Sequence, residues 1–580
     1  MQKMMHVDPR RPFPRRFVPQ TADMGEWSQI EPLYRELLDR PINSRADLEQ
    51  WLADTFELAS VIGEERTRRY IAMTQQTDDK TREAAYQHFI EHIDPQIKPL
   101  AHAQQVKYLE SPSRAELDMT RHGVMDRIID NDVKLFREEN VPLETQEALL
   151  AKEYQKVTGA MTVTYRDQEL TLQQAAKYLD ETDRAVREEV WQLVTDRRLA
   201  DRAQLDDQYD QLLALRQQIA ANAGFDNYRD YAFKRRRRFD YTPDDCFRFH
   251  DGVEEAVMPL VRRIMADRRR RLGVDLLRPW DLNVDPEGRP PLRPFSDAGE
   301  LVNSTVEIFT RVDPELGAQF KFMSDEQLLD LESRKGKAPG GYQSTLAERR
   351  WPFIFMNAVG RDDDIRTLLH EGGHAFHMLA AREEPIIYYR HAPLEFAEVA
   401  SMGMELLAAP HLNVFYKDPE EYIRSRRTTL EDAVMILPWI AIIDSFQHWI
   451  YTHPGHTREE RVAAWLTVHN RFDGAVHNGT PNWSGLHEAQ AYRWQAQLHL
   501  YTVPFYYIEY GIAETGALQV WAASRRDHRG AVERYWQALA LGGSRPLPDL
   551  FAAAGAKFRF DADTLRPLVE AVADELNSLN

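Results

Sequence analysis

The sequence predicts a large, mainly α-helical protein with only a few short strands. Over most of its 580 residues, apolar side chains recur at three- and four-residue spacing among charged ones, which is the pattern of amphipathic helices. Strand signals are few, and no fixed-period repeat indicates a solenoid. The composition, 43% hydrophobic and 28% charged, is ordinary for a globular protein with a sizeable core.

Four segments show the helical pattern most clearly, and small polar residues mark where two helices begin. Ser44 and Thr171 are placed to act as N-caps, since their side-chain oxygens can accept the first free backbone N–H groups of a helix. A short hairpin is expected over 161–171, where β-prone residues flank a polar turn. The helical segments are 46–73, 81–109, 173–223 and 243–272.

A second strand signal precedes a further helix that carries His370. The turn-rich segment 336–342 breaks the helical pattern and is followed by the β-prone residues 352–357. Together they predict a small sheet beside that helix. The exposed edge of such a sheet could bind an extended peptide by strand addition, or the two segments could form a purely structural hairpin. The sequence favours neither reading over the other.

The net charge and the hydropathy of the chain argue against two classes of binding partner, nucleic acids and membranes. The formal net charge of −19 disfavours nucleic acid, because a phosphate-binding protein needs a basic face. The one basic run, 234–238, is expected to be a solvated helix end or a set of internal ion-pair partners. No unbroken run of about 18 apolar residues indicates a membrane span. The N-terminal arginines precede no apolar stretch, so no export signal is expected and the predicted location is cytoplasmic.

The chain contains a single cysteine, Cys246, which excludes intramolecular disulfides and a thiolate-rich metal site. Its acidic neighbours Asp244 and Asp245 would disfavour a thiolate. We therefore expect a structural cysteine and not a nucleophile.

The strongest chemical signal is the sequence His370-Glu371-Gly372-Gly373-His374. Two histidines four residues apart lie on one face of a helix, where both imidazoles can bind a single cation. Glu371 can then act as a general base beside a water that the metal activates. The flanking apolar residues continue the helical pattern, as this geometry requires. The two glycines cost helix stability, around 1 kcal/mol each against alanine, which points to close packing at these positions.

A catalytic zinc needs a third protein ligand and one open position. His377 follows at three residues, and we expect it to be structural or to support the ligands. Three glutamates, Glu395, Glu398 and Glu405, occur in a second apolar helix over 394–407, at spacings that place them on one side. One of them can bind the metal while the others orient imidazole N–H groups. Helix spacing alone does not decide which glutamate is the ligand.

These motifs resemble the thimet oligopeptidase and oligoendopeptidase F family of zinc metallopeptidases, in particular its Pz-peptidase branch. The resemblance rests on His-Glu-Gly-Gly-His-Ala-Phe-His at 370–377 and on Glu-Phe-Ala-Glu-Val-Ala-Ser-Met-Gly-Met-Glu at 395–405. It implies Glu398 as the third zinc ligand, whereas thermolysin-type spacing would favour Glu395. Further segments that resemble the family are 224–231, 277–282, 335–342 and 504–511.

The resemblance also implies an architecture. Members of the family are large helical metallopeptidases with a deep substrate channel that admits short unfolded peptides, and here a small β-sheet is expected beside the active-site helix. We expect residues 1–195 to form an N-terminal helical region that makes part of the channel wall, and residues 196–580 to form the catalytic region. Oligopeptides are then the expected substrates, with one Zn²⁺ per chain and no nucleic-acid or membrane partner. The sequence does not indicate the oligomeric state.

The C-terminal part supplies hydrogen-bond donors for an oxyanion. His499, Tyr506, Tyr507 and Tyr510 form a dense donor cluster in an otherwise apolar stretch. By resemblance, His499, Tyr507 and Tyr510 stabilise the intermediate and hold the substrate, with Tyr506 as the alternative to Tyr507. At least one of these tyrosines is expected to serve only in packing.

The sequence thus predicts a zinc-dependent endopeptidase that hydrolyses short oligopeptides, with Glu371 as the general base. Two other readings remain open. A metallocarboxypeptidase or dipeptidyl carboxypeptidase would need a cationic group for the peptide's C-terminal carboxylate, and arginines are abundant. A metal-stabilised peptide-binding scaffold is disfavoured, because Glu371 and the donor cluster are both present.

Overall fold

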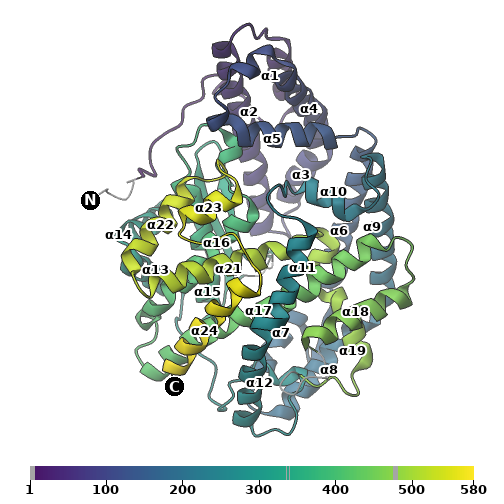
Figure 1. The fold of residues 1–580 in the computed structure, drawn as a ribbon, viewed down its shortest axis with the longest axis vertical. Helices are drawn as coiled ribbons and strands as arrows, with labels where there is room; N and C mark the ends of the chain where they lie inside the picture. Colours follow the sequence, from purple (N-terminus) through teal and green to yellow (C-terminus); the bar gives the residue numbers. More distant parts are fainter. Residues whose placement is uncertain (1–6, 335, 339, 474–480, 580) are drawn as a thin grey trace. The chain divides into compact units, whose positions relative to one another are not determined.

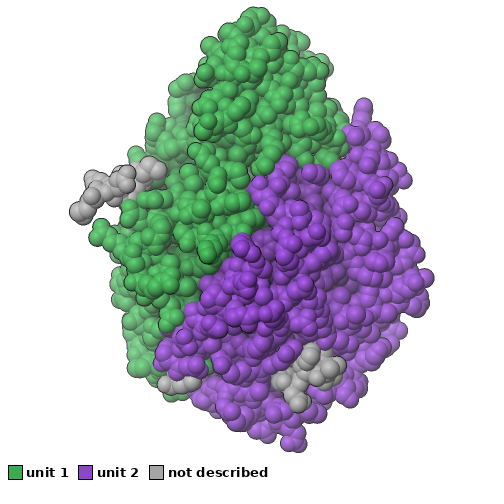
Figure 2. Space-filling model, viewed as in Figure 1, with its two compact units in different colours: residues 1–136, 293–429, 516–558 green, residues 137–292, 430–515, 559–580 purple. Residues whose placement is uncertain are grey.

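The computed structural model describes residues 7–334, 336–338, 340–473 and 481–579. The chain packs as two compact units, each made of three stretches of sequence (Figure 2). Unit 1 comprises residues 1–136, 293–429 and 516–558, and unit 2 comprises residues 137–292, 430–515 and 559–580. Both are mainly helical, as the sequence predicts.

Unit 1 contains an N-terminal group of helices and the paired helices that carry the metal-binding motif (Figure 1). In the N-terminal group, Leu37, Trp51, Phe89 and Met125 are almost completely buried in one apolar core. The helices that lie wholly in unit 1 are α1 (Trp27–Asp39), α2 (Arg45–Gln75), α3 (Lys80–His88), α4 (Asp94–Glu110), α5 (Met119–Leu135), α13 (Ala298–Val312), α14 (Pro314–Asp325), α15 (Asp362–Ala380), α16 (Leu394–Ala408), α22 (His528–Ala540) and α23 (Leu547–Ala553).

The predicted small sheet is present and packs against α15. Its three strands are β3 (Leu329–Glu332), β4 (Tyr342–Leu346) and β5 (Trp351–Ala358), in the order β3-β5-β4. β4 runs antiparallel to β5, and β3, which the sequence did not predict, runs parallel to it. Of the expected turn segment before β4, Pro339 lies outside the described residues.

An ion pair links Asp330 of β3 to Lys337, in the segment between β3 and β4. The Lys337 ammonium group donates to the Asp330 carboxylate at 2.9 Å and to the backbone oxygen of Glu332 at 2.9 Å. Arg334 makes a second contact with the Asp330 carboxylate, at 2.6 Å. Burial opposes ionisation of Asp330, but the hydrogen bonds from Arg334 and Lys337 prevail and lower its pKa to about 2.

Unit 2 contains a second set of helices and one hairpin. The predicted hairpin consists of β1 (Thr162–Tyr165) and β2 (Gln168–Thr171), joined through Arg166 and Asp167 at positive φ angles. The helices wholly within unit 2 are α6 (Asn140–Gly159), α7 (Leu172–Ala176), α8 (Arg184–Ala200), α9 (Arg202–Asn222), α10 (Tyr228–Arg235), α11 (Pro243–Gly252), α12 (Met258–Leu272), α18 (Arg458–Asp473), α19 (His487–Ala491), α20 (Leu498–Thr502) and α24 (Ala562–Ser578).

Two helices have residues in both units: α17 (Pro419–Thr452) and α21 (Tyr507–Ser524). By length and composition α17 could cross a membrane, since an 18-residue window has a mean hydropathy of 1.4. However, 72% of that window is buried inside the protein, as expected of a core helix.

The predicted helix starts are confirmed, but some of the predicted helices are interrupted. Ser44 caps α2 by accepting the Asp47 N–H, and Thr171 forms a capping box with Gln174 at α7. The predicted segment 81–109 instead holds a π-helical turn at Phe89–Ile93. The other segments that are broken are 173–223, which forms three α-helices, and 243–272, which holds a π-helical turn at Val253–Val257.

Candidate metal centre

Helix α15 places His370 and His374 side by side in unit 1. Its first turn carries Asp362, Asp363 and Asp364, and these acids favour a helix N-terminus through the helix dipole. Because the histidines are four residues apart, their rings lie on one face, with centroids 5.0 Å apart. Both rings are half-buried.

Glu398 of α16 brings a carboxylate oxygen to both imidazoles. Its Oε2 atom lies 3.4 Å from His370 Nε2 and 3.5 Å from His374 Nε2. Ser401 donates its hydroxyl to the same carboxylate at 2.9 Å, which fixes the glutamate rotamer. One donor atom from each of the three residues lies within 4.8 Å of the others. This set of two imidazoles and one carboxylate is a known ligand set of catalytic zinc.

Two glycines allow α15 to approach its neighbours closely. A Cβ atom on Gly373 would lie 2.4 Å from the carbonyl oxygen of Ala400 in α16, and one on Gly372 would lie 2.6 Å from the Phe309 ring. Helices α15 and α16 pack against each other in unit 1. The close packing expected from these helix-weakening residues is therefore present, and it brings Glu398 to the histidines.

Glu405 supports the site from the other side of His370. Its carboxylate lies 2.7 Å from His370 Nδ1, so that Nε2 is left facing His374 and Glu398. Burial lowers the pKa of His370, but the hydrogen bonds and charges of Glu398 and Glu405 outweigh it and raise that pKa well above the ordinary value. The carboxylates around the imidazoles thus favour positive charge here, and the residues fit a divalent cation.

Glu371 is buried beside the two histidines, and one of its carboxylate oxygens is available to accept a hydrogen bond. Its Oε2 atom has no hydrogen-bond partner among the described residues, although only 7% of the residue is exposed. Burial raises the pKa of Glu371, the charges of His370 and His374 lower it, and a backbone hydrogen bond from Gln343 of β4 lowers it as well. The net direction is upward, which strengthens this carboxylate as a base.

The remaining predicted residues of α15 and α16 take other positions. Glu395 is buried, but its carboxylate is not in the group of ligand atoms formed by His370, His374 and Glu398. His377 is buried against Phe396, and burial lowers its pKa to about 3, so it is a neutral core histidine. That position agrees with the structural role expected for it.

Unit 2 holds the predicted donor cluster. The ring of His499 lies 4.9 Å from the ring of Tyr507, 5.6 Å from that of Tyr506 and 5.9 Å from that of Tyr510, between centroids. Tyr507 is buried, and burial raises its pKa to about 12. Tyr506 and Tyr510 are half-buried. The four residues therefore lie together, but Tyr507 is more deeply buried than Tyr506 and Tyr510.

A polar chain orients the histidine of this cluster. The Gln497 amide lies 2.8 Å from His499 Nδ1, and its oxygen accepts the Trp439 indole N–H at 2.9 Å. Tyr507 is also hydrogen-bonded to Gln497 and Trp439. One network thus positions both the imidazole and the buried tyrosine.

The turn that precedes α21 is held by arginines of the basic run. Phe505 adopts a positive φ of 63°, and its N–H donates to the Gln447 side chain at 2.6 Å. Arg238 donates to the Phe505 carbonyl oxygen and, at 2.9 Å, to the Glu509 carboxylate, while Arg236 donates to the Pro504 carbonyl oxygen at 2.8 Å. The run at 234–238 therefore includes internal ion-pair partners, one of the two alternatives expected for it.

Comparison with known proteins assigns the chain to a family. A family model described as peptidase family M3 matches residues 177–570, and one described as the peptidase M3 N-terminal domain matches residues 17–136. The chain belongs to peptidase family M3. Both the metal-binding motif of α15 and the glutamates of α16 lie inside the longer match, as does the His499 cluster.

Individual M3 relatives agree with this assignment. The chain is 24% identical over 310 residues to oligopeptidase PepF of Bacillus subtilis, an alignment that covers 51% of this chain and 43% of that protein. It is 26% identical over 175 residues to an oligoendopeptidase F homologue of Lactococcus lactis, covering 30% of this chain and 28% of that protein. The aligned stretches span less than half the length of these curated relatives.

The solved M3 structures match over nearly the whole chain. A Pz peptidase A structure with an inhibitor superposes with a TM-score of 0.89 at 27% identity, covering 97% of this chain and 99% of that one. An X-ray structure assigned to oligoendopeptidase F gives a TM-score of 0.88 at 29% identity, covering 97% and 98%. The mainly helical peptidase fold is thereby established.

Several supporting residues of this M3 chain were not identified from the sequence. Ser401 lies three residues after Glu398, a helical spacing that was a usable signal. Gln343 and Trp439 act through contacts between segments far apart in the chain, for which a single sequence holds no signal. Gln497 lies only two residues before His499.

Proposed function

We propose that this M3 protein is a zinc-dependent endopeptidase that hydrolyses short oligopeptides. The observation that carries the proposal is the proximity of His370, His374 and Glu398 to one another. Beside them lies the buried Glu371, whose Oε2 atom has no hydrogen-bond partner in the described part of the chain. Such a set combines three metal ligands with a base, which is what hydrolysis of an unactivated amide requires.

In this proposal His370, His374 and Glu398 hold one zinc ion per chain. Zinc, when bound, polarises the scissile carbonyl and lowers the pKa of water toward about 7. Glu371 takes the proton of the attacking water at its carboxylate and passes it to the nitrogen of the leaving amine. Glu405 keeps His370 in the tautomer whose Nε2 lone pair faces the cation.

The substrate class is inferred from the relatives and from the sheet. Relatives with similar sequences are described as oligopeptidases or oligoendopeptidases. β4 is an edge strand, since in the described residues it pairs only with β5, and Gln343 within it hydrogen-bonds Glu371. An extended peptide added to this edge would run past the general base.

His499 with Tyr510 or Tyr507 is proposed to donate hydrogen bonds to the oxyanion that forms on the substrate. Such donors act best when they are fixed before the reaction begins. The Gln497 contact to His499 and the arginine-held turn at Phe505 support this assignment, because both reduce the freedom of the cluster.

The proposal includes three further expectations. A cytoplasmic location suits the degradation of short peptides, and cell fractionation would test it. Residues 1–195 are proposed to form part of a channel wall and 196–580 the catalytic region. Neither nucleic acid nor a membrane is proposed as a partner.

The test compares wild type with Glu371→Gln, which keeps the size of the side chain but removes the base. We expect unchanged zinc content and a fall of several orders of magnitude in cleavage of a quenched fluorescent peptide. Glu326→Gln, at a half-buried glutamate of unit 1 that pairs with Arg10, serves as the control and should retain activity. Near-normal turnover by Glu371→Gln would contradict the assignment.

The same assay separates endopeptidase from carboxypeptidase activity. A peptide blocked at both ends offers no free C-terminal carboxylate, so an endopeptidase cleaves it and a dipeptidyl carboxypeptidase does not. Mass spectrometry of the products identifies the bond that is cut. We expect cleavage of the blocked peptide at an internal bond.

A further inference from the structure

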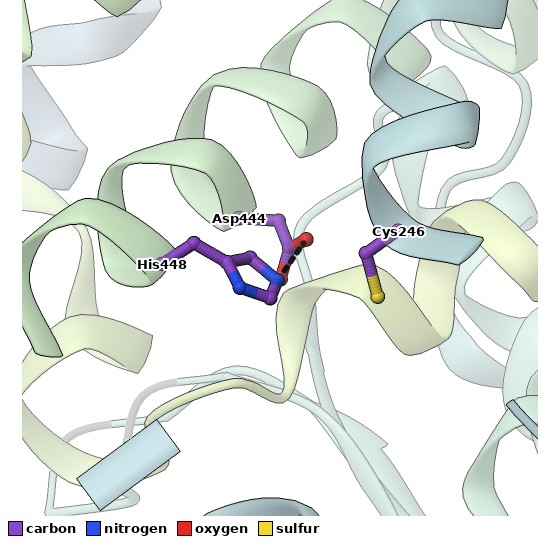
Figure 3. A group of neighbouring side chains, drawn as sticks. All are labelled: Cys246, Asp444 and His448. Atoms are coloured by element: carbon purple, nitrogen blue, oxygen red, sulfur yellow. Dashed lines mark ion pairs between the residues drawn. The ribbon is translucent and has the colours of Figure 1, made fainter. Parts of the chain in front are cut away.

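Unit 2 contains a second group of potential metal ligands, well inside its helical core. Cys246 belongs to α11, whereas Asp444 and His448 lie one turn apart on α17 (Figure 3). The Cys246 Sγ atom, a carboxylate oxygen of Asp444 and a ring nitrogen of His448 all lie within 4.8 Å of one another. Cys246 and Asp444 are fully buried, and 3% of His448 is exposed.

Three polar atoms of His448 and Asp444 have no hydrogen-bond partner among the described residues. These atoms are the two ring nitrogens of His448 and the Oδ1 atom of Asp444. His448 Nε2 lies 3.3 Å from Asp444 Oδ2, near enough for an ion pair, yet the two atoms are not aligned as a hydrogen bond. Leaving buried polar atoms unpaired costs about 1–3 kcal/mol each, so this arrangement calls for a further partner.

Aromatic side chains surround the ring of His448. The ring of His448 is 4.8 Å from Phe247, 5.3 Å from Phe505 and 6.0 Å from Phe233, between centroids. These apolar rings supply no conventional hydrogen-bond partner to either ring nitrogen. A metal ion requires only the donor atoms that already face one another.

The carboxylate of this group is held in place by a neighbour. His250 Nε2 lies 2.9 Å from Asp444 Oδ2, and the Ser445 hydroxyl lies 2.9 Å from His250 Nδ1. Such outer contacts orient the ligands of structural metal sites. His250 thus leaves Oδ1 of Asp444 available.

We propose that Cys246, Asp444 and His448 bind a second divalent transition-metal ion, of the zinc class, which stabilises unit 2. Thiolate, imidazole and carboxylate together suit zinc and cobalt and do not suit magnesium or calcium. Binding converts the Cys246 thiol to a thiolate and releases its proton to solvent. The donors, now up to 4.8 Å apart, draw in to the roughly 3.5 Å spacing of a tetrahedral zinc site.

Two other roles for Cys246, Asp444 and His448 fit the observed burial and hydrogen bonding less well than metal binding does. A nucleophilic cysteine must reach a substrate, but Cys246 is fully buried. A protonated His448 paired with Asp444 would carry two buried N–H groups, neither of them hydrogen-bonded. A metal bound to one ring nitrogen of His448 leaves only one buried N–H group without a hydrogen bond. The metal also binds Cys246.

The chain's single cysteine makes the test specific. Cobalt bound to a thiolate gives a sulfur-to-metal charge-transfer band in the near ultraviolet, and the His370–His374–Glu398 set contains no sulfur. We would express the full chain in cobalt-supplemented, zinc-depleted medium, and record the spectrum and the metal content of the wild type. The expected result is a charge-transfer band and a second metal equivalent.

Two variants separate this site from the proposed catalytic one. Cys246→Ser should lose the band and one metal equivalent while keeping peptidase activity, and His370→Ala with His374→Ala should keep the band and lose activity. A wild-type protein that binds a single equivalent without the band overturns the second site. That outcome leaves the proposed peptidase function intact, since it rests on other residues.

Discussion

Gly373 and Ala400 are in direct contact across the two helices that carry the metal ligands. A Cβ atom on Gly373 would lie 2.4 Å from the Ala400 carbonyl oxygen and 2.6 Å from the Cα atom of Ser401. The Tyr535 hydroxyl donates to the same carbonyl at 2.6 Å, which holds it in place. The separation of α15 and α16 is therefore set by a residue without a side chain.

Gly373→Ala should force these helices apart. Because the neighbouring atoms belong to the backbone, the strain cannot be relieved by a side-chain rotation, and a loss of about 1–3 kcal/mol in stability is expected. Zinc affinity should fall as well, since Glu398 moves with α16. Metal titration and thermal unfolding measure both effects. Gly123→Ala in α5, with nothing within 4 Å of the added Cβ, is the matched control and should not destabilise the protein.

Glu398→Ala should remove or greatly weaken zinc binding, because it deletes the carboxylate that lies near both histidines. Glu395→Ala should leave the zinc content close to that of wild type, since Glu395 lies outside the ligand group. Metal analysis of the purified variants decides between the two glutamates. The reverse pattern would assign the third ligand to Glu395.

Glu405→Gln should weaken zinc binding without abolishing it. The variant keeps the shape of the side chain but loses the charge that orients and polarises His370. Loss of such an outer contact typically lowers metal affinity by about 10- to 100-fold. Competition with a chelator of known affinity measures the change, and equal affinity in variant and wild type would exclude the proposed support.

Changing each tyrosine of the His499 cluster to phenylalanine should affect either kcat or stability, depending on the tyrosine. Tyr510→Phe is expected to lower kcat by about 10²- to 10³-fold with little change in stability, because its half-buried hydroxyl can reach a substrate. Tyr507→Phe should mainly reduce stability, by about 1 kcal/mol, since its buried hydroxyl bonds Gln497 and Trp439. Steady-state kinetics and thermal unfolding of both variants, with Tyr506→Phe alongside, test this division.

Asp330→Asn should destabilise unit 1 in a pH-dependent way. The folded-state pKa of Asp330 is lowered to about 2, so its contribution is complete above its unfolded pKa, near 4, and is lost as the pH falls toward 2. At neutral pH the substitution should cost on the order of 2 kcal/mol, and the difference should shrink below about pH 4. Urea unfolding at several pH values measures it. Asp325→Asn, in an exposed ion pair with Lys321, should change stability by less than about 0.5 kcal/mol throughout.

The features that the sequence predicts well are those that depend on short-range spacing. The His370–His374 pair and the glutamate helix follow from a period of 3.6 residues, and the hairpin at Arg166 follows from turn chemistry. The family resemblance added the choice of Glu398, and the structure places that carboxylate beside both imidazoles.

The features that were missed depend on contacts between distant segments or on small local irregularities. The π-helical turn at Phe89–Ile93 joins α3 directly to α4, so the segment reads as one continuous helix in the sequence. β3 is only four residues long, and its pairing with β5 is what makes it a strand. Asp444 and His448 have a helical spacing visible in the sequence, but the approach of Cys246 from α11 is a property of the fold.

The burial of Cys246 also has a practical consequence for labelling. Since the chain has no other cysteine and this one is inaccessible, a cysteine introduced at a chosen surface position would be the one thiol open to a bulky dye or spin label. A pair of such positions, one in each unit, would allow the distance between the units to be followed in solution without first removing a native thiol.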